Sequence, residues 1–132
     1  MKKEMQNYLP YGKHQVLESD IDAVVDVLRN KNLTQGKVLE EFEESIRNKV
    51  SSNYCIAVNS ATSALHIACL ALGLSKGDYL WTTPTTFVSS ANCGLYCNAY
   101  VDFVDIESST GLISLSQLEE KLEKSKKVGK LP

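Results

Sequence analysis

The stretch AVNSATSALHIACLALG, residues 57–73, decides the fold class. It overlaps a short apolar run, YCIAV at residues 54–58, and continues through small hydroxyl-bearing residues into an apolar helical pattern that stops at Gly73. A nearly continuous apolar run of this length is typical of a strand buried on both faces. Glycine is a common residue at the end of a helix. The stretch therefore predicts a buried strand followed by a helix over about residues 61–72.

The alternation of strand and helix patterns continues toward the C-terminus. Ser114 and Gln117 have the spacing of a capping box, in which two side chains satisfy free amides at the start of a helix. Such alternation is typical of an α/β fold with a parallel sheet covered by helices. The expected elements are strands at residues 79–83 and 99–106 and helices at residues 87–97 and 115–127.

The N-terminal side carries helical patterns only. Ser19 precedes an amphipathic pattern over residues 20–30, and a second pattern covers residues 38–50. We therefore expect a helical segment over residues 1–52 and a partial α/β domain over residues 53–132. The sheet has few expected strands, and the pattern stops soon after a helix, so we also expect the chain to be an N-terminal fragment of a longer domain.

Charge and composition exclude several classes of function. The chain has 132 residues, 16 acidic and 14 basic, with a net charge of −2, which does not favour nucleic acid as a partner. The N-terminus lacks the apolar stretch of a signal peptide, and the apolar segment at residues 64–74 is too short to span a bilayer. We expect a soluble, cytoplasmic protein with no membrane association.

The four cysteines have no CxxC spacing and lie among apolar residues, which is typical of buried reduced thiols. Cys93 and Cys97 are four residues apart and would share a helix face, so a metal site is an alternative, although we predict none. A disulfide framework is not expected without an export signal. The cysteines are Cys55, Cys69, Cys93 and Cys97.

Residues 59–63 lie where the first expected strand ends and the following helix begins. Ligands of α/β proteins bind at the carboxyl ends of strands, where helix N-termini present free amides to anions. A phosphate would bind the amides of Ala61 and Thr62 with help from the Thr62 hydroxyl. The segment has neither the glycines of a P-loop nor a GxGxxG fingerprint. An ordinary cap on a core helix is the alternative interpretation.

Phe87 belongs to TTPTTF, residues 82–87, which follows the second expected strand. If the strands are parallel, this aromatic ring lies on the same rim of the sheet as Thr62. A ring beside a phosphate site would stack on a flat heterocycle. The alternative is that Phe87 is an ordinary core residue.

Four blocks of sequence together resemble the N-terminal part of the DegT/DnrJ/EryC1/StrS aminotransferases, which are pyridoxal-phosphate enzymes of fold type I that aminate nucleotide-linked keto sugars. They are LTQGK (33–37), NSATSALHIACLALGLSKGD (59–78), TTPTTFVSSANCGLY (82–96) and VDFVDI (101–106). The chain departs from the family pattern at Trp81, where an aliphatic residue is usual, and at YCNAY (96–100), where a glycine-alanine turn is usual.

The resemblance implies roles for residues on both sides of the first strand. Ala61 and Thr62 would hold the phosphate of pyridoxal 5'-phosphate, Phe87 would lie against its pyridine ring, and Ser60 would lie near the cofactor rim. The implied sugar-nucleotide site is lined by Tyr11, Lys31, Asn32, Leu33 and Thr34.

The resemblance also implies a substrate and partners. The substrate would be a UDP-linked 4-keto-6-deoxy N-acetyl sugar of the pseudaminic acid type, the amino donor glutamate, and the assembly a homodimer. The family's Schiff-base lysine lies beyond the matched residues, so no catalytic residue is expected among these 132. Two alternatives stay open: a non-catalytic remnant that binds phosphate or pairs with a full-length subunit, and a relative that performs sugar dehydration.

Overall fold

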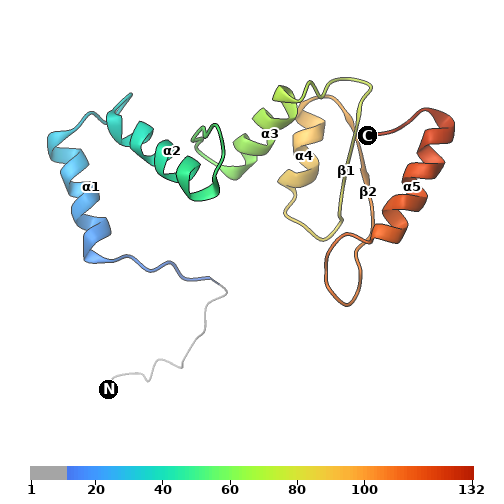
Figure 1. The fold of residues 1–132 in the computed structure, drawn as a ribbon, viewed down its shortest axis with the longest axis horizontal. Helices are drawn as coiled ribbons and strands as arrows, with labels where there is room; N and C mark the ends of the chain where they lie inside the picture. The colour runs from blue at the N-terminus through green and yellow to red at the C-terminus, as the bar shows by residue number, and fades with distance from the viewer. Residues whose placement is uncertain (1–11) are drawn as a thin grey trace, which may run out of the picture. The chain divides into compact units, whose positions relative to one another are not determined.

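A computed structural model describes residues 12–132, which form two compact units that divide between Ala57 and Val58. Each unit is described by itself below, and Figure 1 gives the labels of the helices and strands. The division into residues 1–52 and 53–132 stays a prediction. Within the described residues no helix is long and apolar enough to cross a membrane.

The first unit holds two helices, α1 (Glu18–Asn30) and α2 (Lys37–Val50), as the helical patterns predict. Ser19 was expected to precede α1, but it lies inside the first turn. The backbone amide of Leu17 instead donates to the Asp20 carboxylate at 2.9 Å, so Asp20 supports the start of the helix. No residue of either helix is buried, and both apolar stripes are exposed.

A tight turn at residues 31–36 joins α1 to α2. Gly36 is the residue before α2, and a Cβ atom there would lie 2.5 Å from the Asn32 carbonyl oxygen. Gln35 has a φ of 54°, in the left-handed region that costs most residues energy. Glycine at position 36 therefore lets the two helices follow one another across a short connection.

Residues 54–58 do not form the buried strand that their apolar pattern predicts, and this prediction was wrong. Tyr54 is 86% exposed and Ile56 is 76% exposed, and no strand among the described residues pairs with the segment. The amide of Ala57 donates to a Glu43 carboxylate oxygen at 2.7 Å instead of to a neighbouring strand. An apolar run indicates a tendency to be buried, but a strand also needs a hydrogen-bonding neighbour.

The second unit has the expected alternation of helices and strands. Strands β1 and β2 pair in parallel, with Tyr79 opposite Tyr100 and Thr82 opposite Phe103. Because α4 connects these two strands, they form one βαβ unit, as the sequence predicts. In chain order the elements are α3 (Ala61–Ala71), β1 (Tyr79–Thr82), α4 (Ser89–Tyr96), β2 (Tyr100–Phe103) and α5 (Leu115–Val128).

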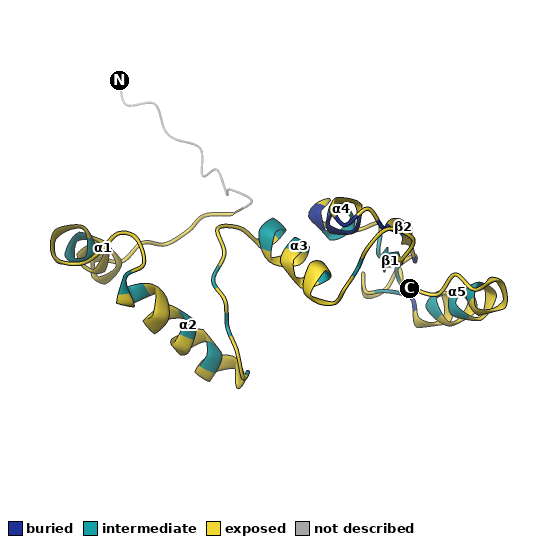
Figure 2. Ribbon diagram, turned by 90° about the horizontal axis from the view of Figure 1, so that it is seen from above, coloured by how far each residue is buried: buried dark blue, intermediate teal, exposed yellow. Residues whose placement is uncertain are grey.

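The buried part of this unit lies where α4 packs against the sheet, and Figure 2 shows the buried residues gathered on and after α4. A Cβ atom on Gly94 would lie 2.8 Å from Val101 Cγ2 and 3.2 Å from Leu80 Cβ. Glycine has a low helix propensity, but here it allows the helix to approach the sheet closely. The buried hydrophobic residues of the described chain are Cys93, Cys97, Ala99 and Val104.

The turn between α4 and β2 contains one of the two departures from the family pattern. Asn98 has a φ of 59°, and its amide donates to the Leu95 carbonyl at 2.9 Å. The amide of Ala99 then donates to the Gly94 carbonyl at 3.0 Å, which closes the end of the helix. Asparagine tolerates this left-handed conformation better than most residues, so the turn forms without a glycine at that position.

The helix α5 begins after Ser114, but the predicted capping box does not form. The Ser114 hydroxyl donates to Glu107 at 2.5 Å instead of accepting from a helix amide. An acceptor seven residues earlier in the chain competes for the hydroxyl, and the local SxxQ spacing contains no information about it.

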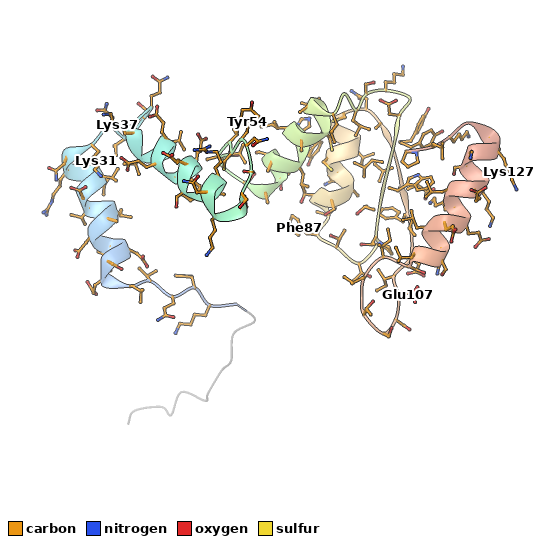
Figure 3. The ribbon with its side chains drawn as sticks, viewed as in Figure 1. Lys31, Lys37, Tyr54, Phe87, Glu107 and Lys127 are labelled. Carbon is orange, nitrogen blue, oxygen red and sulfur yellow. The ribbon has the colours of Figure 1, made fainter. Side chains whose placement is uncertain are left out.

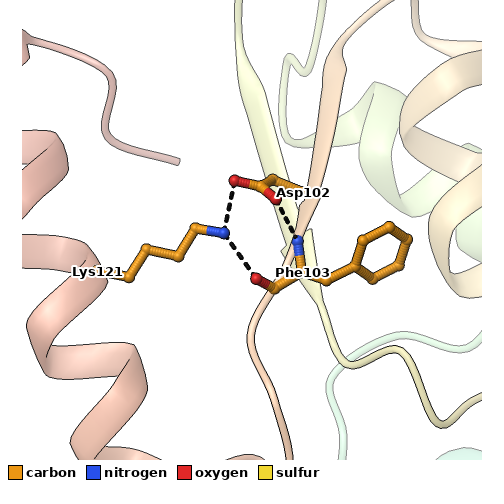
Figure 4. Close-up of polar contacts among 3 residues, drawn as sticks. All are labelled: Asp102, Phe103 and Lys121. Atoms are coloured by element: carbon orange, nitrogen blue, oxygen red, sulfur yellow. Dashed lines mark hydrogen bonds and ion pairs between the residues drawn. The ribbon is translucent and has the colours of Figure 1, made fainter.

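Lys121 connects α5 to the sheet, as Figure 4 shows. Its Nζ atom lies 2.5 Å from Asp102 Oδ2 and donates to the Phe103 carbonyl oxygen at 2.6 Å. The same ammonium lies 5.0 Å from the centre of the Trp81 ring, within the range of a cation–π interaction. Trp81, the second departure from the family pattern, therefore has a cationic partner on α5, although its buried indole Nε1 has no acceptor in the part of the chain described.

Candidate functional site

The second unit presents a rim where helices begin and strands end. In Figure 1, α3 and α4 run side by side in the same direction, and the starts of both helices lie at the end of the unit where β1 and β2 finish. The carboxyl ends of parallel strands and the N-termini of the adjoining helices are where α/β proteins bind ligands. Positive partial charge at the start of each helix favours an anion there.

The start of α3 has two free backbone donors. The Ser60 hydroxyl accepts from the Ser63 amide at 3.2 Å, and the Ser60 carbonyl accepts from the Ala64 amide at 3.1 Å. No acceptor within residues 12–132 is recorded for the amides of Ala61 and Thr62, the first two residues of the helix. These amides are therefore available to an anion outside the chain.

A hydrogen-bonded group of side chains supports this helix start. The Ser63 hydroxyl donates to Asn59 Oδ1 at 2.7 Å and lies 3.0 Å from the Ser60 hydroxyl. The resemblance places Ser60 near the cofactor, and the structure gives its hydroxyl an additional role as the helix cap. We did not assign a role to Asn59 or Ser63, although the SxxS spacing at the start of a helix is a signal that could have identified Ser63.

The side chains at the start of α3 are small and at least partly exposed. Ala61 is exposed and Thr62 is half-buried, and the Thr62 hydroxyl makes no recorded hydrogen bond within the described chain. Two free amides and one hydroxyl are donors suited to the oxygens of a phosphate group. These residues therefore fit the phosphate of a cofactor.

Phe87 lies between β1 and α4, on the same rim. Its side chain is 73% exposed, which does not agree with the alternative role as a core residue. Figure 3 shows Phe87 next to the start of α4, which it precedes in the chain. Thr62 and Phe87 thus come from the starts of two adjacent helices at one end of the unit. An exposed ring in this position is able to stack on a flat ligand held at the rim.

The remaining predicted site residues belong to the first unit. Lys31, Asn32, Leu33 and Thr34 form most of the turn between α1 and α2, beside which Figure 3 labels Lys31 and Lys37. Leu33 is 69% exposed. Tyr11 lies outside the described residues. Nothing in the structure tests the assigned roles of these residues, and they stay predictions.

A hollow of about 620 Å³ lies at this turn. Lys31 and Asn32 line it, whereas Leu33 and Thr34 do not. Gln35 and Lys37 also line the hollow, and sequence reasoning did not single them out, although both belong to the block LTQGK. The turn therefore presents amide and ammonium donors to solvent.

The Lys31 side chain forms an ion pair with a carboxylate on α1. Its Nζ atom lies 3.1 Å from Asp26 Oδ2, and the Asn30 side-chain amide donates to Asp26 Oδ1 at 2.8 Å. Both contacts lower the pKa of Asp26 from its ordinary value, and the hydrogen bond from Asn30 is the larger cause. This pair is solvent-exposed, so it orients Lys31 and contributes little to stability.

The thiols form no metal site in the described residues. No group of three or more ligating side chains there has an arrangement that could hold a metal ion. Cys93 and Cys97 are buried free thiols on α4 and at its end, and Cys69 is half-buried on α3. Burial raises the pKa of Cys69 to about 11, and the neighbouring thiols of Cys93 and Cys97 add to the shift. A thiol with this pKa is unreactive at neutral pH.

Several solved structures with a similar fold are aminotransferases. A putative sugar aminotransferase from Streptococcus pneumoniae, in its PLP form, superimposes with a TM-score of 0.80 and is 27% identical. The match covers 85% of this chain and 29% of that structure. The same protein is known in a PMP form. The fold of this chain is thus that of the N-terminal part of a PLP-dependent aminotransferase.

The sequence identifies the family within that class. Residues 14–128 match the model of the DegT/DnrJ/EryC1/StrS aminotransferase family, and the chain belongs to this family. It is 40% identical over 117 residues to the UDP-4-amino-4,6-dideoxy-N-acetyl-beta-L-altrosamine transaminase of Campylobacter jejuni. It is 33% identical over 119 residues to the spore coat polysaccharide biosynthesis protein SpsC of Bacillus subtilis.

These matches cover most of this chain and a smaller part of each relative. They cover 89% and 90% of this chain, but the chain spans about 31% of the length of either relative. Members of the family use pyridoxal phosphate.

Proposed function

We propose that this chain forms the cofactor-phosphate part of a pyridoxal-phosphate-dependent aminotransferase that acts on a nucleotide-linked 4-keto-6-deoxy sugar. The observation that carries the proposal is the pair of free amides at Ala61 and Thr62, on the same rim as the exposed ring of Phe87. Membership of the family supports the same cofactor and reaction class.

Each rim residue has a distinct part in this proposal. The amides of Ala61 and Thr62 donate to phosphate oxygens, and the Thr62 hydroxyl adds a third donor. Ser60, through its bond to the Ser63 amide, keeps the start of α3 in place. Phe87 covers one face of the cofactor ring and excludes water from it. The bound cofactor supplies an electron sink for the transfer of the amino group.

The substrate assignment extends the proposal to the first unit. We assign the turn at residues 31–34, together with Tyr11, to the binding of a UDP-linked N-acetyl sugar of the pseudaminic acid type. The exposed donors at this turn and the 40% identity to an altrosamine transaminase support the assignment. Glutamate is the proposed amino donor, and a homodimer is the proposed assembly.

The lysine that forms the Schiff base is proposed to lie outside these 132 residues. Lys121 is already held by Asp102 and the Phe103 carbonyl, on the helix that follows the sheet. Lys76 lies in the turn between α3 and β1, which joins the end of the helix to the start of the strand, away from the rim. Neither side chain is therefore placed to form a Schiff base at the rim.

The Ala61→Pro variant tests the phosphate site directly. Ala61 is the first residue of α3, where proline is tolerated but removes the backbone donor. A hydrogen bond to a charged group contributes about 1.5–3 kcal/mol, so we expect pyridoxal phosphate to bind about tenfold more weakly or worse. The measurement is isothermal titration of the 132-residue chain with pyridoxal phosphate, and separately with inorganic phosphate.

Leu115→Pro is the matched control, because Leu115 is the exposed first residue of α5 in the same unit. This variant should bind pyridoxal phosphate as the parent chain does. Equal weakening in both variants, or unchanged affinity in Ala61→Pro, would overturn the assignment of the amides.

A further inference from the structure

We draw no further inference here: the strongest candidate, the cluster of the Cys69, Cys93 and Cys97 thiols where α3 packs on α4, rests on the raised pKa of the Cys69 thiol alone, and the described residues form neither a disulfide nor a metal-binding group there.

Discussion

The Ser60 hydroxyl accepts a hydrogen bond from the Ser63 amide at 3.2 Å. The amides at the start of α3 therefore differ in whether they have an acceptor. The amide of Ser63 is satisfied by this bond, whereas those of Ala61 and Thr62 have no acceptor within residues 12–132. The cap therefore holds the start of α3 in place without occupying the two amides that we propose bind phosphate.

Replacement of the cap should weaken the second unit. We expect Ser60→Ala to lower the free energy of unfolding by about 1 kcal/mol, the usual cost of losing a serine cap. Urea denaturation followed by circular dichroism measures the change. Ser109→Ala, in an exposed turn, is the control and should be neutral. A Ser60→Ala variant as stable as the control would show that the cap contributes nothing.

A second prediction concerns the packing of α4 on the sheet. Gly94→Ala places a methyl group 2.8 Å from Val101 Cγ2, and overpacking of this kind costs about 1–3 kcal/mol. The double variant Gly94→Ala with Val101→Ala removes the clash with Val101 Cγ2, so its loss should be smaller than the sum of the two single losses. Gly12→Ala is the control, because nothing lies within 4 Å of the added atom. Additive losses would contradict the close approach.

A third prediction concerns the left-handed turn after α4. Asn98 has a φ of 59°, which glycine adopts at no steric cost and alanine adopts poorly. Asn98→Gly should therefore stabilise the chain slightly, and Asn98→Ala should destabilise it by about 1 kcal/mol. Thermal unfolding of the two variants should give opposite shifts in Tm. Shifts of the same sign and size would mean that the turn does not require this conformation.

The link between Asp102 and Lys121 makes the stability depend on pH. The hydrogen bond from Lys121 is the largest cause that lowers the pKa of Asp102, and the bond from the Phe103 amide adds to it. A lowered pKa in the folded state contributes stability that is present above the ordinary value of 3.8 and is lost as the pH falls through the folded value. The carboxylate is largely exposed, so the contribution is at most about 1 kcal/mol.

Urea denaturation at pH 6 and pH 3 tests this dependence. Asp102→Asn should be less stable than the parent chain at pH 6. The difference should shrink at pH 3, below the ordinary pKa of 3.8, because the carboxylate of the unfolded parent chain is largely protonated there and part of the contribution is lost. Asp22→Asn is the control, because this exposed side chain makes no ion pair within the described residues. An undiminished difference at pH 3 would assign the loss to packing instead of charge.

The periodicity of apolar residues predicts the helices of the second unit, because a helix forms from residues that are close together in the chain. The pattern over residues 61–72 predicts α3, and the helix ends before Gly73, which has a φ of 83°. The run at residues 54–58 has an equally clear pattern but forms no strand, because pairing depends on a neighbour that the pattern does not specify. Local patterns thus predict helices more reliably than they predict strands.

Contacts between distant residues were the part that the sequence could not predict. Ser114 fits a capping box by spacing, yet its hydroxyl bonds to Glu107. Lys121 is one of several lysines on α5, and nothing in the local sequence marks it as the one that contacts Asp102 and Trp81. Thr62 and Phe87 come from the starts of the neighbouring helices α3 and α4, although the strand expected before Thr62 does not form, and their roles stay predictions.

The most direct test of the phosphate site is a nuclear magnetic resonance titration of the ¹⁵N-labelled 132-residue chain with pyridoxal phosphate, with pyridoxal as the phosphate-free comparison. The account predicts that the amide resonances of Ala61 and Thr62 shift with pyridoxal phosphate and stay in place with pyridoxal. Shifts confined to other parts of the chain, or the same shifts with both compounds, would contradict it.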